Sequence, residues 1–299
     1  MDPTKLAWQS KLVLLLVLPA VAADVAWQAY AQTIATSPVV VWTFGLSALL
    51  GLVAWKVRSA TPAAAATGAL LTASLMFSTA SQPYIPWQTN LVPLVVLLVL
   101  TALATRLGRR RKEQLGTAER PSGRTSSQVA ANLGVATLFT CQVAQSWQMS
   151  LGWLHLARLP FTAAYIAGLA ALCEAAADTV SSELGQVLSG SPRMITTFRV
   201  AAPGTDGAIS LGGTLAGVIA AGIVATAGTL ALRGDLFLFA VSWIASVFGL
   251  CFDSLLGATL ERSEWLNNDA VNFLSTASAA ACALVLVATI PNLVPSTLR

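Results

Sequence analysis

The chain has 299 residues, of which 56% are hydrophobic and only 10% are charged, and its mean hydropathy is +0.71. Soluble domains carry about 25% charged residues, so this composition excludes an ordinary soluble protein and indicates a polytopic membrane protein. The formal net charge of +4 does not indicate nucleic-acid binding, because no basic face interleaved with aromatic side chains occurs on a soluble segment.

Nine apolar stretches are each long enough to cross the membrane as a helix, because a rise of ~1.5 Å per residue covers a ~30 Å hydrocarbon layer in about 20 residues. The apolar runs are continuous rather than alternating, which favours helices over a barrel. We therefore predict an all-α protein with about nine transmembrane helices. The predicted spans are 12–31, 37–55, 62–80, 90–105, 127–149, 160–178, 210–231, 235–258 and 270–290.

Positive charges predict the orientation of these helices, because short cytoplasmic loops collect Lys and Arg. With nine crossings, the N-terminus and the loops after the second, fourth, sixth and eighth helices lie on one side of the membrane. All but three of the 17 Lys and Arg fall on that side, the exceptions being Arg158, Arg233 and Arg299. We therefore expect the N-terminus inside and the C-terminus outside.

A basic, turn-rich segment at residues 106–126 divides the chain and contains the consecutive basic residues Arg109–Lys112. We expect it to be a cytoplasmic linker. Residues 1–105 are poor in ionisable groups, with Asp24 as the one acid inside a predicted helix, and predict a four-helix membrane scaffold. Residues 127–299 hold the dense polar clusters and predict a five-helix catalytic region.

Acidic side chains on the sixth predicted helix are a strong sign of chemistry, because charge inside a membrane is costly. Glu174 and Asp178 are four residues apart and share a helix face, whereas Glu183 is rotated from Asp178 by roughly 140°. The three converge only if the helix bends or ends near Ser181. A divalent cation such as Mg²⁺, held by one or two carboxylates and substrate phosphates, would relieve their repulsion. An ion pair between helices or a protonated carboxyl is the alternative.

Two arginines and a glycine-containing turn follow this helix. Arg193 and Arg199 offer forked donors that suit phosphate oxygens, although the accumulation of positive charge inside explains them equally well. The turn that follows has two glycines able to adopt positive φ, and its backbone N–H groups, with those of the next helix start, are suited to binding an anion. The candidate residues for this role are Gly204, Thr205, Asp206, Gly207 and Ser210.

The last two predicted helices also carry polar groups toward the predicted cytoplasmic side. Asp253 and Glu261 fall on one face of the eighth helix, two turns apart. The ninth helix opens with Asn268 and Asn272 on a shared face and with Asp269, which is alternatively an acid that stabilises a helix start.

On the seventh predicted helix, Gly213 and Gly217 form a Gly-xxx-Gly step. This pattern is typical of a close contact between two membrane helices.

Six motifs occur in order along the chain and together resemble a known membrane family. They are Arg124-x-x-x-Gln128-Val-x-x-Asn132-Leu-Gly134, Ala177-Asp178-Thr-x-Ser-Ser-Glu183-Leu-Gly185, Pro192-Arg193-x-Ile-Thr-Thr, Pro203-Gly-Thr-Asp-Gly-x-Ile-Ser210-x-x-Gly213-Thr, Asp253-Ser-Leu-Leu-Gly-Ala-Thr and Asn268-Asp269-x-Val-Asn272-Phe.

Over about residues 60–290, this series resembles the integral membrane family that contains phytyl-phosphate kinase and transmembrane protein 19. The resemblance implies phosphorylation of an isoprenoid monophosphate, such as phytyl or geranylgeranyl phosphate, to the diphosphate. It also implies a distant similarity to membrane polyprenol kinases and phosphatidate cytidylyltransferases, which use CTP. From the resemblance we expect Glu at position 253 and Gln at position 261 in many members. The carboxylate of this face is therefore expected to differ in position here, and either Asp253 or Glu261 faces the site.

The leading hypothesis is a membrane kinase of isoprenoid monophosphates that uses ATP or CTP with Mg²⁺, with its active site facing the cytoplasm and the prenyl tail in the membrane. The acceptor is an ionised phosphate that needs no strong base, which suits a chain whose one histidine is His155. The predicted catalytic residues are Asp178, Glu183, Arg193, Arg199 and Asp253. The predicted metal ligands are Asp178, Glu183, Asp253 and Asp269, and the predicted nucleotide-binding residues are Gly204, Thr205, Asp206, Gly207, Ser210, Asn268, Asp269 and Asn272.

Two other functions fit the same residues. A cytidylyltransferase acting on a lipid phosphate would keep the site and change the reaction. A transporter or flippase would use Glu174 and Asp178 as a proton or cation relay.

Overall fold

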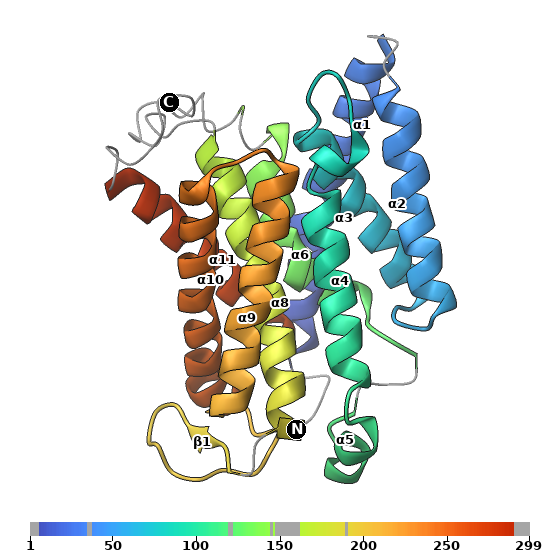
Figure 1. Cartoon of the computed structure of the whole chain (residues 1–299). Coiled ribbons are helices and arrows are strands. Elements are labelled where there is room, and N and C mark those ends of the chain that lie inside the picture. The colour runs from blue at the N-terminus through green and yellow to red at the C-terminus, as the bar shows by residue number, and fades with distance from the viewer. Residues whose placement is uncertain are drawn as a thin grey trace.

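The computed structural model describes residues 6–34, 38–118, 122–143, 146, 162–188 and 191–289, and within them the chain is helical apart from one short hairpin (Figure 1). His155 and the basic residues Arg158 and Arg299 lie outside the described residues. The helices are α1 (Ala7–Ile34), α2 (Val39–Lys56), α3 (Pro62–Ser78), η1 (Pro86–Gln88), α4 (Leu91–Arg106), α5 (Arg109–Leu115), α6 (Ser126–Thr140), α8 (Thr162–Leu188), α9 (Leu211–Ala231), α10 (Leu236–Leu256), the π-helix η4 (Gly257–Glu261) and α11 (Asn268–Thr289). The hairpin pairs β1 (Arg193–Met194) with β2 (Ala208–Ile209) in antiparallel register.

Six of the described helices are long and apolar enough to cross a membrane, namely α1, α2, α8, α9, α10 continued by η4, and α11. Helices α4 and α5 meet this criterion only as a pair bent by 64°, and α3 is apolar but shorter. The prediction of a polytopic helical membrane protein is therefore confirmed. A helix lies at each of the nine predicted positions, but nine crossings and the orientation of the termini stay predictions.

Helix α8 is the centre of the bundle, because α4, α5, α6, α9, α10 and α11 all pack against it. In its most apolar stretch, 89% of the residues are buried within the protein. In the other candidate spans the buried share is 22–39%. Alanine and glycine at positions such as Ala167, Gly168 and Ala171 allow neighbouring helices to approach closely. Glu174, one of the acids of α8, is fully buried and consequently surrounded by protein rather than by lipid.

The Gly-xxx-Gly step on α9 makes the predicted close contact with α8. A Cβ atom added at Gly213 would lie 2.7 Å from the carbonyl oxygen of Ser181, and one added at Gly217 would lie 2.7 Å from that of Ala177. These backbone oxygens flank Asp178 in the sequence, so the contact with α9 fixes the turn of α8 that carries this acid.

The helices before and after the predicted linker pack together, with α1 and α3 against α6, and α4 against α8 and α9. Asp24 is fully buried at one such junction. Its carboxylate accepts hydrogen bonds from Ser74 Oγ of α3 at 2.6 Å and from the backbone N of Gln142 at 2.9 Å. The described helices on both sides of residues 106–126 share one core. The division of the chain at this segment stays a prediction.

Several polar loops meet at one end of the bundle, where α5 and the hairpin lie at the bottom of Figure 1. Ala60, after α2, forms a backbone bridge with Arg124, before α6. Gln9, near the start of α1, donates its side-chain N–H to the carbonyl oxygen of Trp265 at 2.8 Å. The charge distribution predicts that this end faces the cytoplasm.

Replacement of Gly217 by alanine should reduce the free energy of unfolding by about 1–3 kcal/mol, because the new methyl group would overlap the backbone of α8. Unfolding in sodium dodecyl sulfate would measure the change. Gly45→Ala in α2 is the matched control, since a Cβ atom there meets nothing within 4 Å. Equal stability of the two variants would contradict the tight α8–α9 contact.

Candidate active site

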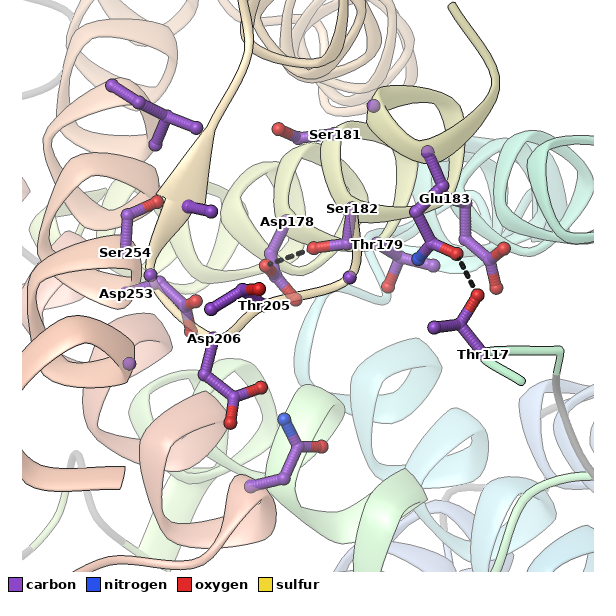
Figure 2. Close-up of a pocket in the computed structure, with 18 of the residues that line it drawn as sticks. Thr117, Asp178, Thr179, Ser181, Ser182, Glu183, Thr205, Asp206, Asp253 and Ser254 are labelled. Atoms are coloured by element: carbon purple, nitrogen blue, oxygen red, sulfur yellow. Dashed lines mark hydrogen bonds between the residues drawn. The ribbon is translucent and has the colours of Figure 1, made fainter. Parts of the chain in front are cut away.

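A polar cavity of about 390 Å³ lies at this end of the bundle, and most of the predicted site residues line it. Its walls come from α6, α8, α10, α11 and the loop that carries the hairpin, with Thr117 at one edge. Figure 2 shows Asp178, Asp253 and Asp206 grouped around this space from three separate segments. Residues far apart in the sequence therefore contribute to a single site.

One wall of the cavity is acidic. Asp178 of α8 and Asp253 of α10 lie close enough for their carboxyl groups to interact directly, and Ser182 Oγ donates to Asp178 Oδ1 at 3.4 Å. Oδ2 of Asp253 is buried and accepts no hydrogen bond from a described residue. Two carboxylates this close repel each other unless a proton or a cation lies between them. Glu261 of η4 also lines the cavity, so the predicted shared face of Asp253 and Glu261 is confirmed.

Arginine and amide side chains also line the cavity. Arg124, Gln128 and Asn132 line the cavity at steps of four residues before and along α6, and Asn268 and Asn272 join them from α11. The guanidinium of Arg124 attracts the carboxylate of Asp178 electrostatically. Arg124 was not among the predicted catalytic residues, although its spacing from Gln128 and Asn132 is the signal that would have identified it.

The position of Arg124 is fixed by the loop between α2 and α3. Its backbone N donates to the Ser59 carbonyl oxygen at 2.9 Å, and the Thr61 backbone N donates to the Arg124 carbonyl oxygen at 3.0 Å. Gly123, at φ +76°, permits this approach, since a Cβ atom there would lie 2.4 Å from the Ser59 carbonyl carbon. This end of the predicted linker is consequently a rigid part of the site.

The glycine turn has the conformation predicted for it and lines the cavity. Gly204 and Gly207 have φ values of +83° and +73°, and Ser210 caps α9 by accepting a hydrogen bond from the Gly213 backbone N at 3.2 Å. Burial raises the pKa of the Asp206 carboxyl above its ordinary value, and the Arg262 guanidinium partly offsets that effect. Thr205, also in this turn, lines the cavity with Asp206.

Glu183 touches the cavity, but its carboxylate is bound elsewhere. Oε2 pairs with Lys112 Nζ at 2.5 Å, and Oε1 accepts a hydrogen bond from Thr105 Oγ1 at 3.1 Å. Helix α8 continues to Leu188 without the bend near Ser181 that convergence required, so Glu183 is rotated away from Asp178 (Figure 2). The structure thus gives Glu183 a buried ion pair in place of a position beside the other acids.

Three more predicted residues lie outside the cavity. Asp269 is buried at the start of α11 and accepts a hydrogen bond from Ser10 Oγ of α1 at 2.6 Å, which ties the two helices together. Arg193 and Arg199 are exposed on the hairpin, where the Arg193 guanidinium donates to the Phe198 carbonyl oxygen at 2.9 Å. Neither arginine is among the residues that line the cavity with the acids. Within the described ranges, no group of three or more His, Cys, Asp or Glu residues is arranged to hold a metal ion.

The fold and this cavity define the class of protein: a polytopic helical membrane protein with a carboxylate-lined polar site at one end. The chain belongs to the integral membrane protein DUF92 family, whose model matches residues 45–280. This match confirms the family resemblance given by the six motifs.

Curated relatives come from archaea, cyanobacteria and plants. The uncharacterized membrane protein MJ0933 of Methanocaldococcus jannaschii is 36% identical over 62% of this chain and 71% of its own length. The uncharacterized membrane protein sll0875 of Synechocystis sp. is 33% identical over 68% of this chain and 75% of its own length. Protein VTE6, chloroplastic, of Arabidopsis thaliana is 30% identical over 63% of this chain, but the match spans only 55% of VTE6. No solved structure matches the chain.

Replacement of Lys112 by methionine should lower the free energy of unfolding by about 3 kcal/mol, because Glu183 would lose the cation that neutralises it in a half-buried position. The double variant Lys112→Met/Glu183→Leu should recover part of this loss. The exposed pair of Arg109 and Glu113 is the control, and Arg109→Gln should change stability by about 0.5 kcal/mol. If Lys112→Met were as mild as Arg109→Gln in detergent unfolding, the structural role given to Glu183 would be incorrect.

Proposed function

We propose that this protein is a membrane kinase that phosphorylates an isoprenoid monophosphate to the diphosphate, using a nucleoside triphosphate and Mg²⁺. The observation that carries the proposal is that Asp178, Asp253, Arg124 and the Gly204–Gly207 turn all line one cavity. Membership of the family that contains phytyl-phosphate kinase supports the reaction class, as does the similarity to VTE6. Phytyl and geranylgeranyl phosphate are the acceptors that this resemblance suggests.

Asp178 and Asp253 fit a magnesium site better than the wider set of four predicted ligands. Their carboxyl groups lie together, and the unpartnered Oδ2 of Asp253 is available as a ligand. Mg²⁺ is commonly held by one or two carboxylates and substrate phosphates, so a cluster of three acids is not required. When bound, the ion would neutralise charge on the phosphate oxygens. Glu183 and Asp269 are left out, because their carboxylates are bound to Lys112 and Ser10.

The phosphate groups would lie between the acidic wall and Arg124. A guanidinium can donate two parallel hydrogen bonds to phosphate oxygens, and Arg124 replaces the exposed Arg193 and Arg199 in this role. Backbone N–H groups near Gly204 and the start of α9, after Ser210, provide a second region suited to phosphate. Asn268 and Asn272 could donate further hydrogen bonds to the nucleotide.

The transfer itself requires positioning more than acid–base chemistry. An oxygen of the acceptor monophosphate attacks the γ-phosphorus, the bond from that phosphorus to the β–γ bridging oxygen breaks, and the nucleoside diphosphate leaves. Because the attacking oxygen is already ionised, no side chain needs to remove a proton from it. The prenyl tail would extend from the cavity into the apolar layer between helices.

Purified protein in lipid nanodiscs should convert labelled phytyl or geranylgeranyl phosphate to the diphosphate when Mg²⁺ and ATP or CTP are supplied. Asp178→Asn and Asp253→Asn should each lower kcat at least about 100-fold, because the metal would lose a charged ligand. Glu113→Gln, an exposed acid on α5, is the control and should keep wild-type activity. A CDP-lipid product, identified by mass spectrometry, would indicate a cytidylyltransferase, and no product with any nucleotide would refute the proposal.

Arg124→Gln should lower kcat/KM at least about 100-fold, whereas Arg193→Gln and Arg199→Gln should lower it less than about tenfold. The reason is that Arg124 lines the cavity, while the other two arginines are exposed on the hairpin. Steady-state kinetics of the three variants would measure this order. A larger loss of kcat/KM in Arg193→Gln or Arg199→Gln than in Arg124→Gln would contradict this assignment and indicate that the hairpin arginines bind phosphate.

A further inference from the structure

Glu174 is a buried acid for which the proposed mechanism has no role. It lies one helical turn from Asp178 on the same face of α8, and only 1% of its surface is exposed. Its Oε1 atom accepts no hydrogen bond from any described residue. An unpartnered carboxylate oxygen inside a membrane bundle is costly, so its retention requires a reason.

Gly249 shows where the Glu174 side chain points. A Cβ atom added at Gly249 of α10 would lie 2.6 Å from Glu174 Cγ and 3.1 Å from the Ser275 carbonyl oxygen of α11. The Glu174 side chain therefore passes over Gly249 at the junction of α8, α10 and α11. Asp253 is one turn further along the same face of α10, and its carboxyl group is near enough to that of Glu174 for the two to repel each other.

Ser275 supplies a hydroxyl group at the same junction. It lies near both the Glu174 and Asp253 carboxyl groups, while its Oγ donates a hydrogen bond to the Asn272 carbonyl oxygen at 3.1 Å. Asp253 contributes the second buried oxygen without a partner, Oδ2. Two carboxylates and a hydroxyl, drawn from three helices, thus meet beneath the cavity.

The negative charge at this junction exceeds the positive charge near it. Asp253 is repelled by Asp178, Glu174 and Glu261. Among the basic residues in the described part of the chain, Arg124 lines the cavity and attracts Asp178. Arg262 attracts Asp206, a fifth acid, which in turn repels Glu261. Two guanidinium groups do not balance five carboxylates, so bound cations or protons are needed for neutrality.

We infer that Glu174, Asp253 and Ser275 form a second, inner cation site that takes a small divalent ion such as Mg²⁺ or Mn²⁺. Carboxylate and hydroxyl oxygens are ligands that hard cations prefer. Asp253 has two oxygen atoms and would be shared with the outer ion at Asp178. Paired divalent ions recur in enzymes of phosphate transfer, where together they stabilise the attacking and leaving oxygens. The outer ion at Asp178 belongs to the proposed function, and the inference rests on that proposal only in assuming this ion.

Binding of Mn²⁺ alone to the full-length protein in nanodiscs tests the inference, with electron paramagnetic resonance used to count bound ions and detect their coupling. The wild-type protein should bind two ions per chain with dipolar broadening. Glu174→Gln should bind one ion without broadening, whereas the exposed control Glu113→Gln should still bind two. Ser275→Ala is the second variant, for use if Glu174→Gln does not fold. It should lower the affinity for one of the two Mn²⁺ ions about tenfold.

The outcomes separate this inference from the proposed function. One ion that is lost in Asp178→Asn but kept in Glu174→Gln would overturn the inner site and leave the kinase proposal standing. Protons would then neutralise Glu174. No bound Mn²⁺ at millimolar concentration in the wild-type protein would overturn the inner site and the outer metal site together.

Discussion

The structure depends on one constraint: carboxylates placed in a membrane helix must be shielded from lipid and balanced by partners. Helix α8 meets the first condition because six other helices pack around it, and small residues at its surface let them approach. Gly217 of α9 lies close to the backbone of α8, and Gly249 of α10 lies close to the Glu174 side chain. These two contacts fix the turns of α8 that carry Glu174 and Asp178. The same packing that holds the bundle together therefore positions the acids at the cavity and beneath it.

The second condition, charge balance, organises the rest of this end of the bundle. Lys112 neutralises Glu183 and joins α5 to α8, while Arg124 lines the cavity and attracts Asp178. Both basic residues belong to the segment 106–126, which the sequence suggested was a linker. Thr117, from the same segment, lines the cavity and hydrogen-bonds to the Gln186 side chain of α8. This segment is thus part of the site wall, and it connects the first four helices to the acids.

Features set by local sequence were predictable. Apolar runs gave the helix positions, Gly204 and Gly207 gave the positive-φ turn, and the four-residue spacing placed Asp253 and Glu261 on one face. The partner of Glu183 was not predictable, because it depends on the length of α8 and on the fold-back of α5. The roles expected of Arg193 and Arg199 came from residue type and proximity in the sequence, whereas their exposure on the hairpin is a tertiary property. The motif pattern was sufficient to identify the family, since it samples all parts of the site in order.

The central claim is that Asp178 and Asp253 hold a metal ion whose phosphate ligands reach Arg124 in one cavity. A structure of the protein with Mn²⁺ and a non-hydrolysable nucleotide, with the metal located by anomalous scattering, tests it most directly. The account predicts a metal peak about 2.2 Å from carboxylate oxygens of Asp178 and Asp253, with phosphate density at the Arg124 guanidinium. A metal bound at Glu183 or Asp269, or phosphates held by Arg193 and Arg199 on the hairpin, would contradict it.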